Sequence, residues 1–459
     1  MANIPRVAAS PVLLDRRART LYYVEDDRVH KDLKTKEGTT AAVAVRTSSG
    51  LSGYFSFKLA PPPDVSYLDL HWPKGPEESS AYFPSQPAYS SVLATDENLL
   101  LIRVAVPGLP CYYDVPHDLF VYTAAGPRPS LEQLPLYTEC PHNLIDRFCV
   151  RRSGIGILRL AGDESQYIVA DLIVEKPRSG GDYVAELCVF FSAAKTRRKW
   201  QVHTMTAALQ ESAGGQFPVR WLTSTVLPFD GRFLCWVDYL SGVLLLSDFC
   251  RAKAPALRFL PFPGKQYPDK VRMGIGRCCP DRFRSLSVSQ GMLRFVHIDS
   301  DFHERMHMDI AQPRKKSGPK KITVWTLDLG KFRWKKHRDI KLKDLWASYE
   351  DPEIPKRLPE FPVITMDDPD LVWCLLREQE YRGKAWTIVV DMKRAKLASC
   401  TPYVNDQPYH GVNMDLKDSF ANVPLLPLVL SKYLNSTTGI IGNSDKIETR
   451  SSKRIRHSG

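Results

Sequence analysis

Short apolar strands separated by tight turns recur along most of this 459-residue chain. The clearest run holds three predicted strands, at 233–238, 243–248 and 256–261, and further strand pairs follow at 284–298 and 322–336. Gly242 stands in the first of these turns, where we expect glycine to supply a positive φ. Strands of this kind must bury their apolar faces against other sheets, so the pattern predicts an all-β protein.

Three strand pairs, which begin near Val189, Val324 and Thr387, resemble one another. Each has an apolar strand that ends in Asp or Ser, then a basic turn, then an apolar residue that opens the return strand. Repeats of about 40 to 65 residues are typical of propeller blades. We therefore predict a β-propeller-like domain of six or seven blades, with paired β-sandwich domains as the alternative. The pattern does not decide whether the ring of blades closes.

The expected propeller spans residues 11–434. Residues 1–10 are predicted to be a flexible N-terminus, and residues 435–459, rich in Ser, Thr, Lys and Arg, a disordered basic tail. The helical pattern is confined to 342–349 and 141–148.

The ten cysteines are scattered through apolar runs rather than set in a dense framework, which favours reduced thiols. No secretory leader is evident, and no apolar run is long enough to cross a membrane. These features predict a protein of the cytoplasm or nucleus with no membrane contact.

Basic residues are in excess, with a formal net charge of +12. The excess is concentrated in short runs at 314–321, 331–343 and 453–456. Such runs predict exposed loops that contact an acidic protein partner, and weak nucleic-acid binding is the alternative. The candidate contact residues are Arg314, Lys315, Lys316, Lys320, Lys321, Lys335 and Lys336.

A motif in the middle of the chain carries a family resemblance. Trp236, Asp238, Gly242 and Asp248 mark this stretch, and the segments around 285–296, 324–327 and 361–373 follow in order. Together they resemble the plant proteins grouped under domain of unknown function 1618, most strongly over 232–401. That family is similar to kelch-type and F-box-associated propellers and has no assigned activity. The resemblance implies a propeller fold and a structural role for the four motif residues, and it carries no catalytic residues over.

The sharpest catalytic pattern is His303-Glu304-x-x-His307. On a helix, two histidines at this spacing share one face and can bind zinc, while the glutamate polarises a water molecule. Pro313 follows closely, however, and Arg305 places a charge between the two histidines. We interpret the segment as a polar, exposed loop between strands and keep a zinc-dependent hydrolase as the alternative.

The residues therefore favour a non-catalytic protein–protein interaction module with no cofactor. Whether the protein is an enzyme stays open, because no complete catalytic constellation can be inferred from the sequence.

Overall fold

The computed structural model describes residues 11–23, 40, 42–48, 50, 52–60, 64–73, 89–105, 117–124, 129–136, 154–160, 166–176, 182–193, 199–206, 210–211, 217–247, 257–273, 279–303, 318–347, 349, 351–378, 384–403 and 425–428. The predicted flexible N-terminus, basic tail and 141–148 helix lie outside these residues. Described helical segments are short: α2 (Asp269–Met273), the 3₁₀ turn η4 (Pro280–Arg282) and α4 (Leu342–Ala347), which confirms the helix expected at 342–349. None of the described helices could cross a membrane.

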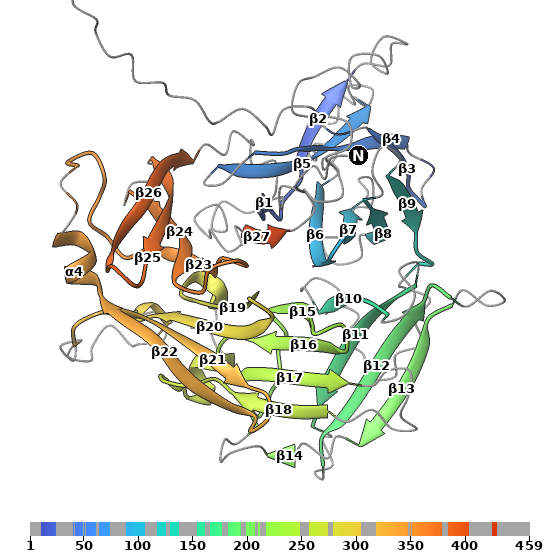
Figure 1. Cartoon of the computed structure of the whole chain (residues 1–459). Helices are drawn as coiled ribbons and strands as arrows, with labels where there is room; N and C mark the ends of the chain where they lie inside the picture. Colours follow the sequence, from blue (N-terminus) through green and yellow to red (C-terminus); the bar gives the residue numbers. More distant parts are fainter. Residues whose placement is uncertain are drawn as a thin grey trace, which may run out of the picture.

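The strands form six sheets that surround a common centre, as Figure 1 shows. We call these sheets blades 1 to 6. Blade 1 runs from the centre outward as β27 (Leu425–Leu428), β1 (Val12–Asp15), β5 (Val65–Pro73), β4 (Ser52–Lys58) and β3 (Val43–Arg46), and β2 (Arg19–Tyr23) also pairs with β5.

Blades 2 and 3 are four-stranded antiparallel meanders. Blade 2 contains β6 (Tyr89–Asp96), β7 (Leu99–Ala105), β8 (His117–Thr123) and β9 (Ser130–Gln133). Blade 3 contains β10 (Ile155–Arg159), β11 (Tyr167–Glu175), β12 (Val184–Phe191) and β13 (Gln201–Thr206).

Blades 4 to 6 repeat this meander, and blade 4 adds one short outer strand. Blade 4 contains β15 (Thr225–Phe229), β16 (Phe233–Asp238), β17 (Gly242–Ser247), β18 (Leu257–Pro261) and the added β14 (Gln210–Glu211). Blade 5 contains β19 (Arg284–Ser289), β20 (Met292–Ile298), β21 (Lys321–Asp328) and β22 (Arg333–Lys341). Blade 6 contains β23 (Glu360–Ile364), β24 (Leu371–Arg377), β25 (Ala385–Asp391) and β26 (Lys396–Tyr403).

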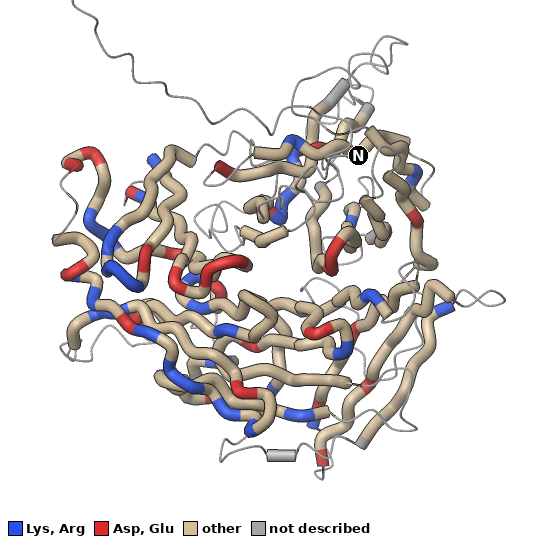
Figure 2. Tube along the Cα trace, viewed as in Figure 1, with Lys and Arg blue, Asp and Glu red and all other residues tan. Residues whose placement is uncertain are grey.

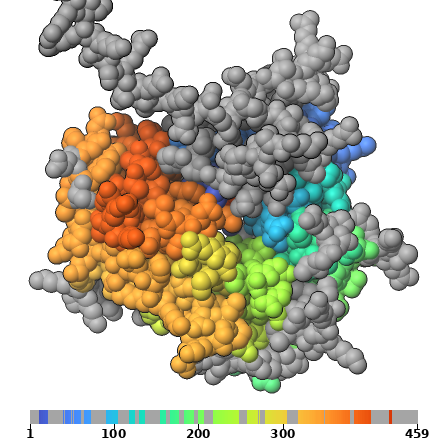
Figure 3. Space-filling model, viewed as in Figure 1, coloured from blue at the N-terminus to red at the C-terminus, as the bar shows by residue number. Residues whose placement is uncertain are grey.

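The ring is closed by strands from the two ends of the described chain. β1 pairs antiparallel with β27, with Leu13 opposite Pro427, so blade 1 contains both. Six apolar clusters each join two consecutive blades, and one of them joins blade 6 back to blade 1 through Leu13, Val65, Phe361 and Trp373. The colours of Figure 3 accordingly follow the chain order around the molecule. The fold is a closed six-bladed β-propeller, and the alternative of paired sandwiches is wrong.

Both faces of each sheet are buried against neighbouring blades. This burial explains why the strands are continuous runs of apolar residues rather than alternations of apolar and polar residues. In β16, Leu234 and Trp236 pack toward blade 3, while Cys235 and Val237 pack toward blade 5. Every one of these four side chains is therefore apolar, whichever way it points.

The three similar strand pairs occupy the same place in three blades. They are the outer hairpins β12–β13, β21–β22 and β25–β26 of blades 3, 5 and 6. The repetition seen in the sequence is thus the repetition of a blade.

The described cysteines are mostly free thiols, but not all. Cys235, Cys279, Cys374 and Cys400 are free, whereas Cys188 in β12 is disulfide-bonded. The expectation of reduced cysteines is wrong for Cys188, because spacing in the sequence does not show which sulfur atoms meet in a folded ring.

Candidate functional site

The described part of the His-Glu-x-x-His segment lies in the core. His303 is 0% exposed, and its ring packs edge-on against Tyr267 and Phe302 at centroid distances of 5.3 and 5.2 Å. The expectation of an exposed loop is therefore wrong at His303, because its ring is buried among aromatic side chains. Glu304 and His307 lie outside the described residues, and so the zinc interpretation stays a prediction. Among the described residues no three or more His, Cys, Asp or Glu side chains gather as a metal site would require.

The family-motif residues shape a hairpin and join it to the next blade. Trp236 is fully buried, and its Nε1–H donates to the carbonyl oxygen of Gly154 at 2.8 Å, which ties blade 4 to blade 3. Asp238, also 0% exposed, accepts hydrogen bonds from the Leu240 amide at 3.0 Å and the Ser241 hydroxyl at 3.1 Å. Asp248 lies outside the described residues. The geometry of the other motif residues is that of a packed turn.

Gly242 allows β17 and β18 to approach closely. The expectation that Gly242 supplies a positive φ is wrong. Its φ is not in the left-handed region, but a Cβ there would lie 2.3 Å from the carbonyl oxygen of Leu260 on β18. In the next blade Gly291 does have the expected backbone, with φ +68°, and Gln290 before it has φ 49°.

Basic side chains gather on the outer hairpin of blade 5, where Figure 2 shows Lys and Arg following β22. The expectation of a loop at 331–343 is wrong, because residues 333–341 pair with β21 as strand β22. A register shift between Val324 and Trp325 leaves three consecutive residues of β22, Lys335 to His337, exposed. We call the following set the blade-5 basic surface: Lys320, Lys321, Lys331, Arg333, Lys335, Lys336, Lys341 and Lys343.

The four described candidate contact lysines all belong to this surface and already make ion pairs. Lys335 Nζ lies 2.8 Å from Asp328, Lys336 Nζ 2.9 Å and Lys321 Nζ 3.7 Å from Asp339, and Lys320 Nζ 3.8 Å from Asp301. Arg314, Lys315 and Lys316 lie outside the described residues.

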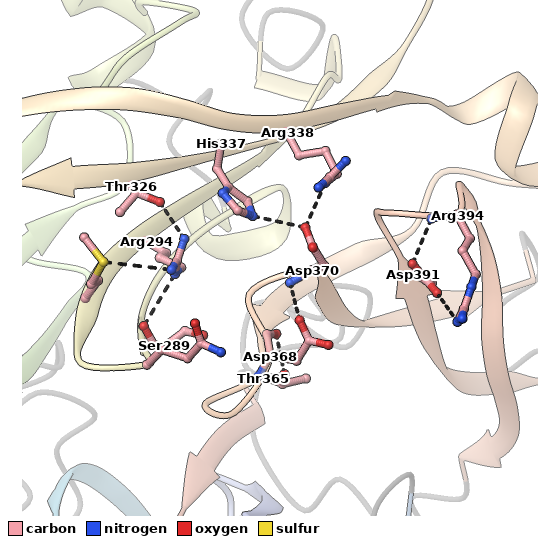
Figure 4. Close-up of polar contacts among 12 residues, drawn as sticks. Ser289, Arg294, Thr326, His337, Arg338, Thr365, Asp368, Asp370, Asp391 and Arg394 are labelled. Carbon is pink, nitrogen blue, oxygen red and sulfur yellow. Dashed lines mark hydrogen bonds and ion pairs between the residues drawn. The ribbon is translucent and has the colours of Figure 1, made fainter.

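Two other basic residues of the same run hold blade 6 instead of facing a partner. Figure 4 shows His337 and Arg338 of β22 both contacting Asp370, which precedes β24. The distances to Asp370 Oδ1 are 3.0 Å from His337 Nε2 and 2.8 Å from Arg338 Nε. Burial raises the pKa of Asp370, but the hydrogen bonds from Arg338 and His337 outweigh burial and lower this pKa overall.

A cavity of ≈ 330 Å³ lies among the innermost strands of the ring. Residues of β6, β15, β19, β23 and β27 line it, and the lining includes the polar residues Arg16, Thr95, Asp96, Glu97, Thr225, Asp230, Tyr239, Asp281, Ser285 and Ser287. It therefore combines apolar walls with a few charged groups, which is typical of small-molecule sites.

The backbone positions Arg16 at this cavity. Arg16 follows β1, and its carbonyl oxygen accepts a hydrogen bond from the Val92 amide of β6 at 2.8 Å. Its Nη2 donates to Thr225 Oγ1, at the start of β15, at 2.9 Å. Burial lowers the pKa of Arg16, yet a guanidinium keeps its charge in proteins. A partly buried cation is thus held at the junction of blades 1, 2 and 4.

Two carboxyl groups of the cavity are ionised less readily than usual. Burial raises the pKa of Asp281, in η4, to about 6, and burial likewise raises the pKa of Asp96, at the end of β6, to about 6. Asp96 Oδ2 accepts a hydrogen bond from the Arg159 amide at 2.7 Å. Perturbed carboxyl groups in a cavity are characteristic of functional sites.

None of these cavity residues was singled out from the sequence. Arg16 lies in a basic pair that follows a strand, and Asp281 lies in a turn beside Pro280, positions that are common on protein surfaces. Only ring closure brings them together, because they are separated by most of the chain.

Comparison with known families identifies part of the chain. Residues 236–373 match the family model described as "Protein of unknown function (DUF1618)". This stretch of the chain is similar to the DUF1618 family. This region starts at Trp236 in blade 4, includes blade 5 and ends at Trp373 in blade 6. It lies inside the range 232–401 over which the resemblance was expected.

Solved structures with a similar chain path are distant in sequence. One is a putative 6-phosphogluconolactonase from Bacteroides uniformis, 12% identical, with a TM-score of 0.34 and coverage of 83% of this chain and 87% of that chain. Another is the periplasmic gluconolactonase PpgL of Pseudomonas aeruginosa, 13% identical, with a TM-score of 0.33 and coverage of 78% and 81%. Comparison with curated protein sequences returns no match.

Proposed function

We propose that this propeller is a non-catalytic interaction scaffold that binds an acidic polypeptide segment on its blade-5 basic surface. The observation that carries the proposal is β22, an outer strand on which basic side chains are exposed at Arg333, Lys335, Lys336 and Lys341. Propeller cores hold such strands rigidly, so the charges keep a defined spacing. A rigid array of charges favours a specific partner.

The ion pairs on this surface do not preclude partner binding. The side chains of Lys335 and Lys336 remain 67% and 51% exposed, although each contacts an aspartate. Exposed ion pairs of this kind contribute about 0–1 kcal/mol each. A partner carboxylate can therefore replace Asp328 or Asp339 at little cost.

Unpaired cations extend the surface beyond these lysines. Lys331, Arg333, Lys341 and Lys343 are exposed, and the described residues contain no ion-pair partner for them. The acidic side chains between them space the positive charge unevenly along β22. Such spacing favours a polypeptide with separated carboxylates over the uniform phosphates of a nucleic acid.

Fluorescence anisotropy with a labelled oligoglutamate peptide tests the proposal, with single-stranded oligothymidylate as the competing probe. Replacing Lys335 and Lys336 by Gln should weaken peptide binding by up to about 30-fold, since each exposed pair contributes up to about 1 kcal/mol. Replacing Lys393 and Lys396 by Gln is the matched control, because these lysines are exposed on blade 6 and the charge change is equal.

Equal effects of the two double substitutions would refute a defined surface. Tighter binding of oligothymidylate than of the peptide, with the same dependence on Lys335 and Lys336, would assign the surface to nucleic acid instead.

A further inference from the structure

The central cavity contains a partly buried cation whose hydrogen-bonding capacity is not used up. Arg16 Nη2 donates to Thr225, but among the described residues nothing accepts a hydrogen bond from the buried Nε. No carboxylate of the described residues lies within ion-pair distance of this guanidinium. Burying a charge without a paired partner is costly, and native proteins offset such a cost where the charge has a use. An anion in the cavity would complete the contacts of Arg16.

A carboxyl group and a hydroxyl group face the same space. Asp281 and Tyr239 both line the cavity, and each interacts electrostatically with Arg16. Arg16 and Asp281 do not form a direct ion pair, and both line the cavity, so a molecule in the cavity can contact both. A group that donates a hydrogen bond would suit Asp281, because a carboxylate only accepts.

The rest of the wall mixes apolar side chains with polar ones, among them Glu97, Asp230, Ser285 and Ser287. Phe229, Phe361 and Leu426 line the cavity together with residues of β19. A volume of ≈ 330 Å³ is at the small end for ligand pockets and would exclude a polypeptide or a nucleotide chain.

We propose that the central cavity binds a small carboxylic acid: its carboxylate pairs with Arg16, a hydroxyl or amino group on it donates to Asp281, and its hydrocarbon part packs on Phe229 and Phe361. This site is separate from the blade-5 basic surface. It gives the propeller a second binding function, independent of any polypeptide partner.

Isothermal titration calorimetry of the full chain with four matched six-carbon probes tests this proposal. The probes are 2-hydroxyhexanoate, norleucine, hexanoate and hexane-1,2-diol. We expect 2-hydroxyhexanoate or norleucine to bind more tightly than hexanoate, which lacks the donor for Asp281, and the diol not to bind. Preference between the first two probes tells whether the donor is a hydroxyl or an amine.

Two substitutions locate the binding. Arg16→Gln should weaken binding of every acid by about 10-fold or more, as expected for loss of a charged hydrogen bond. Asp281→Asn should reduce the advantage of the substituted acids over hexanoate, because an amide oxygen is a weaker acceptor than a carboxylate. Because Asp281→Asn keeps shape and volume, it tests the site even if Arg16→Gln folds poorly. Arg394→Gln is the control, since Arg394 is 70% exposed on blade 6, away from the cavity lining.

The proposal is overturned if no acid gives saturable binding up to about 10 mM, or if Arg16→Gln and Asp281→Asn leave the affinities unchanged. Substitution of Lys335 and Lys336 should leave acid binding intact, so failure of this proposal and failure of the scaffold proposal are distinguishable.

Discussion

Substituting Gly242 by Ala should destabilise the propeller more than a glycine-to-alanine change normally does. The added Cβ would lie 2.3 Å from the Leu260 carbonyl oxygen and 2.9 Å from Pro261 Cα, both backbone atoms of β18. An ordinary contact between carbon and oxygen is about 3.3 Å, so β18 must move by roughly 1 Å. Overpacking costs about 1–3 kcal/mol, and one weakened ladder hydrogen bond adds about 1 kcal/mol. We expect a loss of about 2–4 kcal/mol.

Urea unfolding followed by tryptophan fluorescence measures this loss, and Gly291→Ala is the matched control. Gly291 has φ +68°, and a Cβ added there would meet nothing within 4 Å, so only backbone strain of about 1–2 kcal/mol applies. The two variants therefore separate crowding from strain in hairpins of neighbouring blades. If Gly242→Ala is as stable as Gly291→Ala or more stable, the close approach of β17 and β18 does not explain why residue 242 is a glycine.

Two further predictions concern junctions between blades. Asp370→Asn should lower the free energy of unfolding by about 1–2 kcal/mol at neutral pH, because the charged acceptor of His337 and Arg338 is lost. The folded-state pKa of Asp370 is lowered, so its contribution is present above the ordinary carboxyl pKa and is lost as the pH falls through the lowered value. The urea midpoints of parent and variant should thus converge in acid, and a constant difference would contradict this explanation. Leu13→Ala, at a 0% exposed position between blades 6 and 1, should cost about 2–5 kcal/mol in the same assay, and a loss below about 1 kcal/mol would argue against tight packing where the ring closes.

The blade architecture could be predicted because its physical cause is local. Each blade is a meander of neighbouring strands, so its turns and apolar runs appear consecutively, as at 233–261 and 284–298. The helix at 342–347 could be predicted for the same reason. Gly242 shows the limit of this reasoning, since a glycine in a turn looks the same whether it supplies a positive φ or close packing.

The basic run 331–343 divides in a way that its composition does not reveal. Lys335 and Lys336 face outward, while His337 and Arg338 hold Asp370 of the next blade. The register shift in β21–β22 decides which side chains point where, and that shift depends on the pairing of strands rather than on the charge of the run.

The all-β class, the repeated hairpins and the family region at 236–373 follow from the amino-acid sequence, because these features depend on residues close together in the chain. The six-blade count, the pairing of β1 with β27 and the cavity with Arg16 and Asp281 emerge only in the folded ring. A ring brings its innermost strands together whatever their separation in sequence. The chemistry at its centre is therefore set by closure, and no local pattern records it.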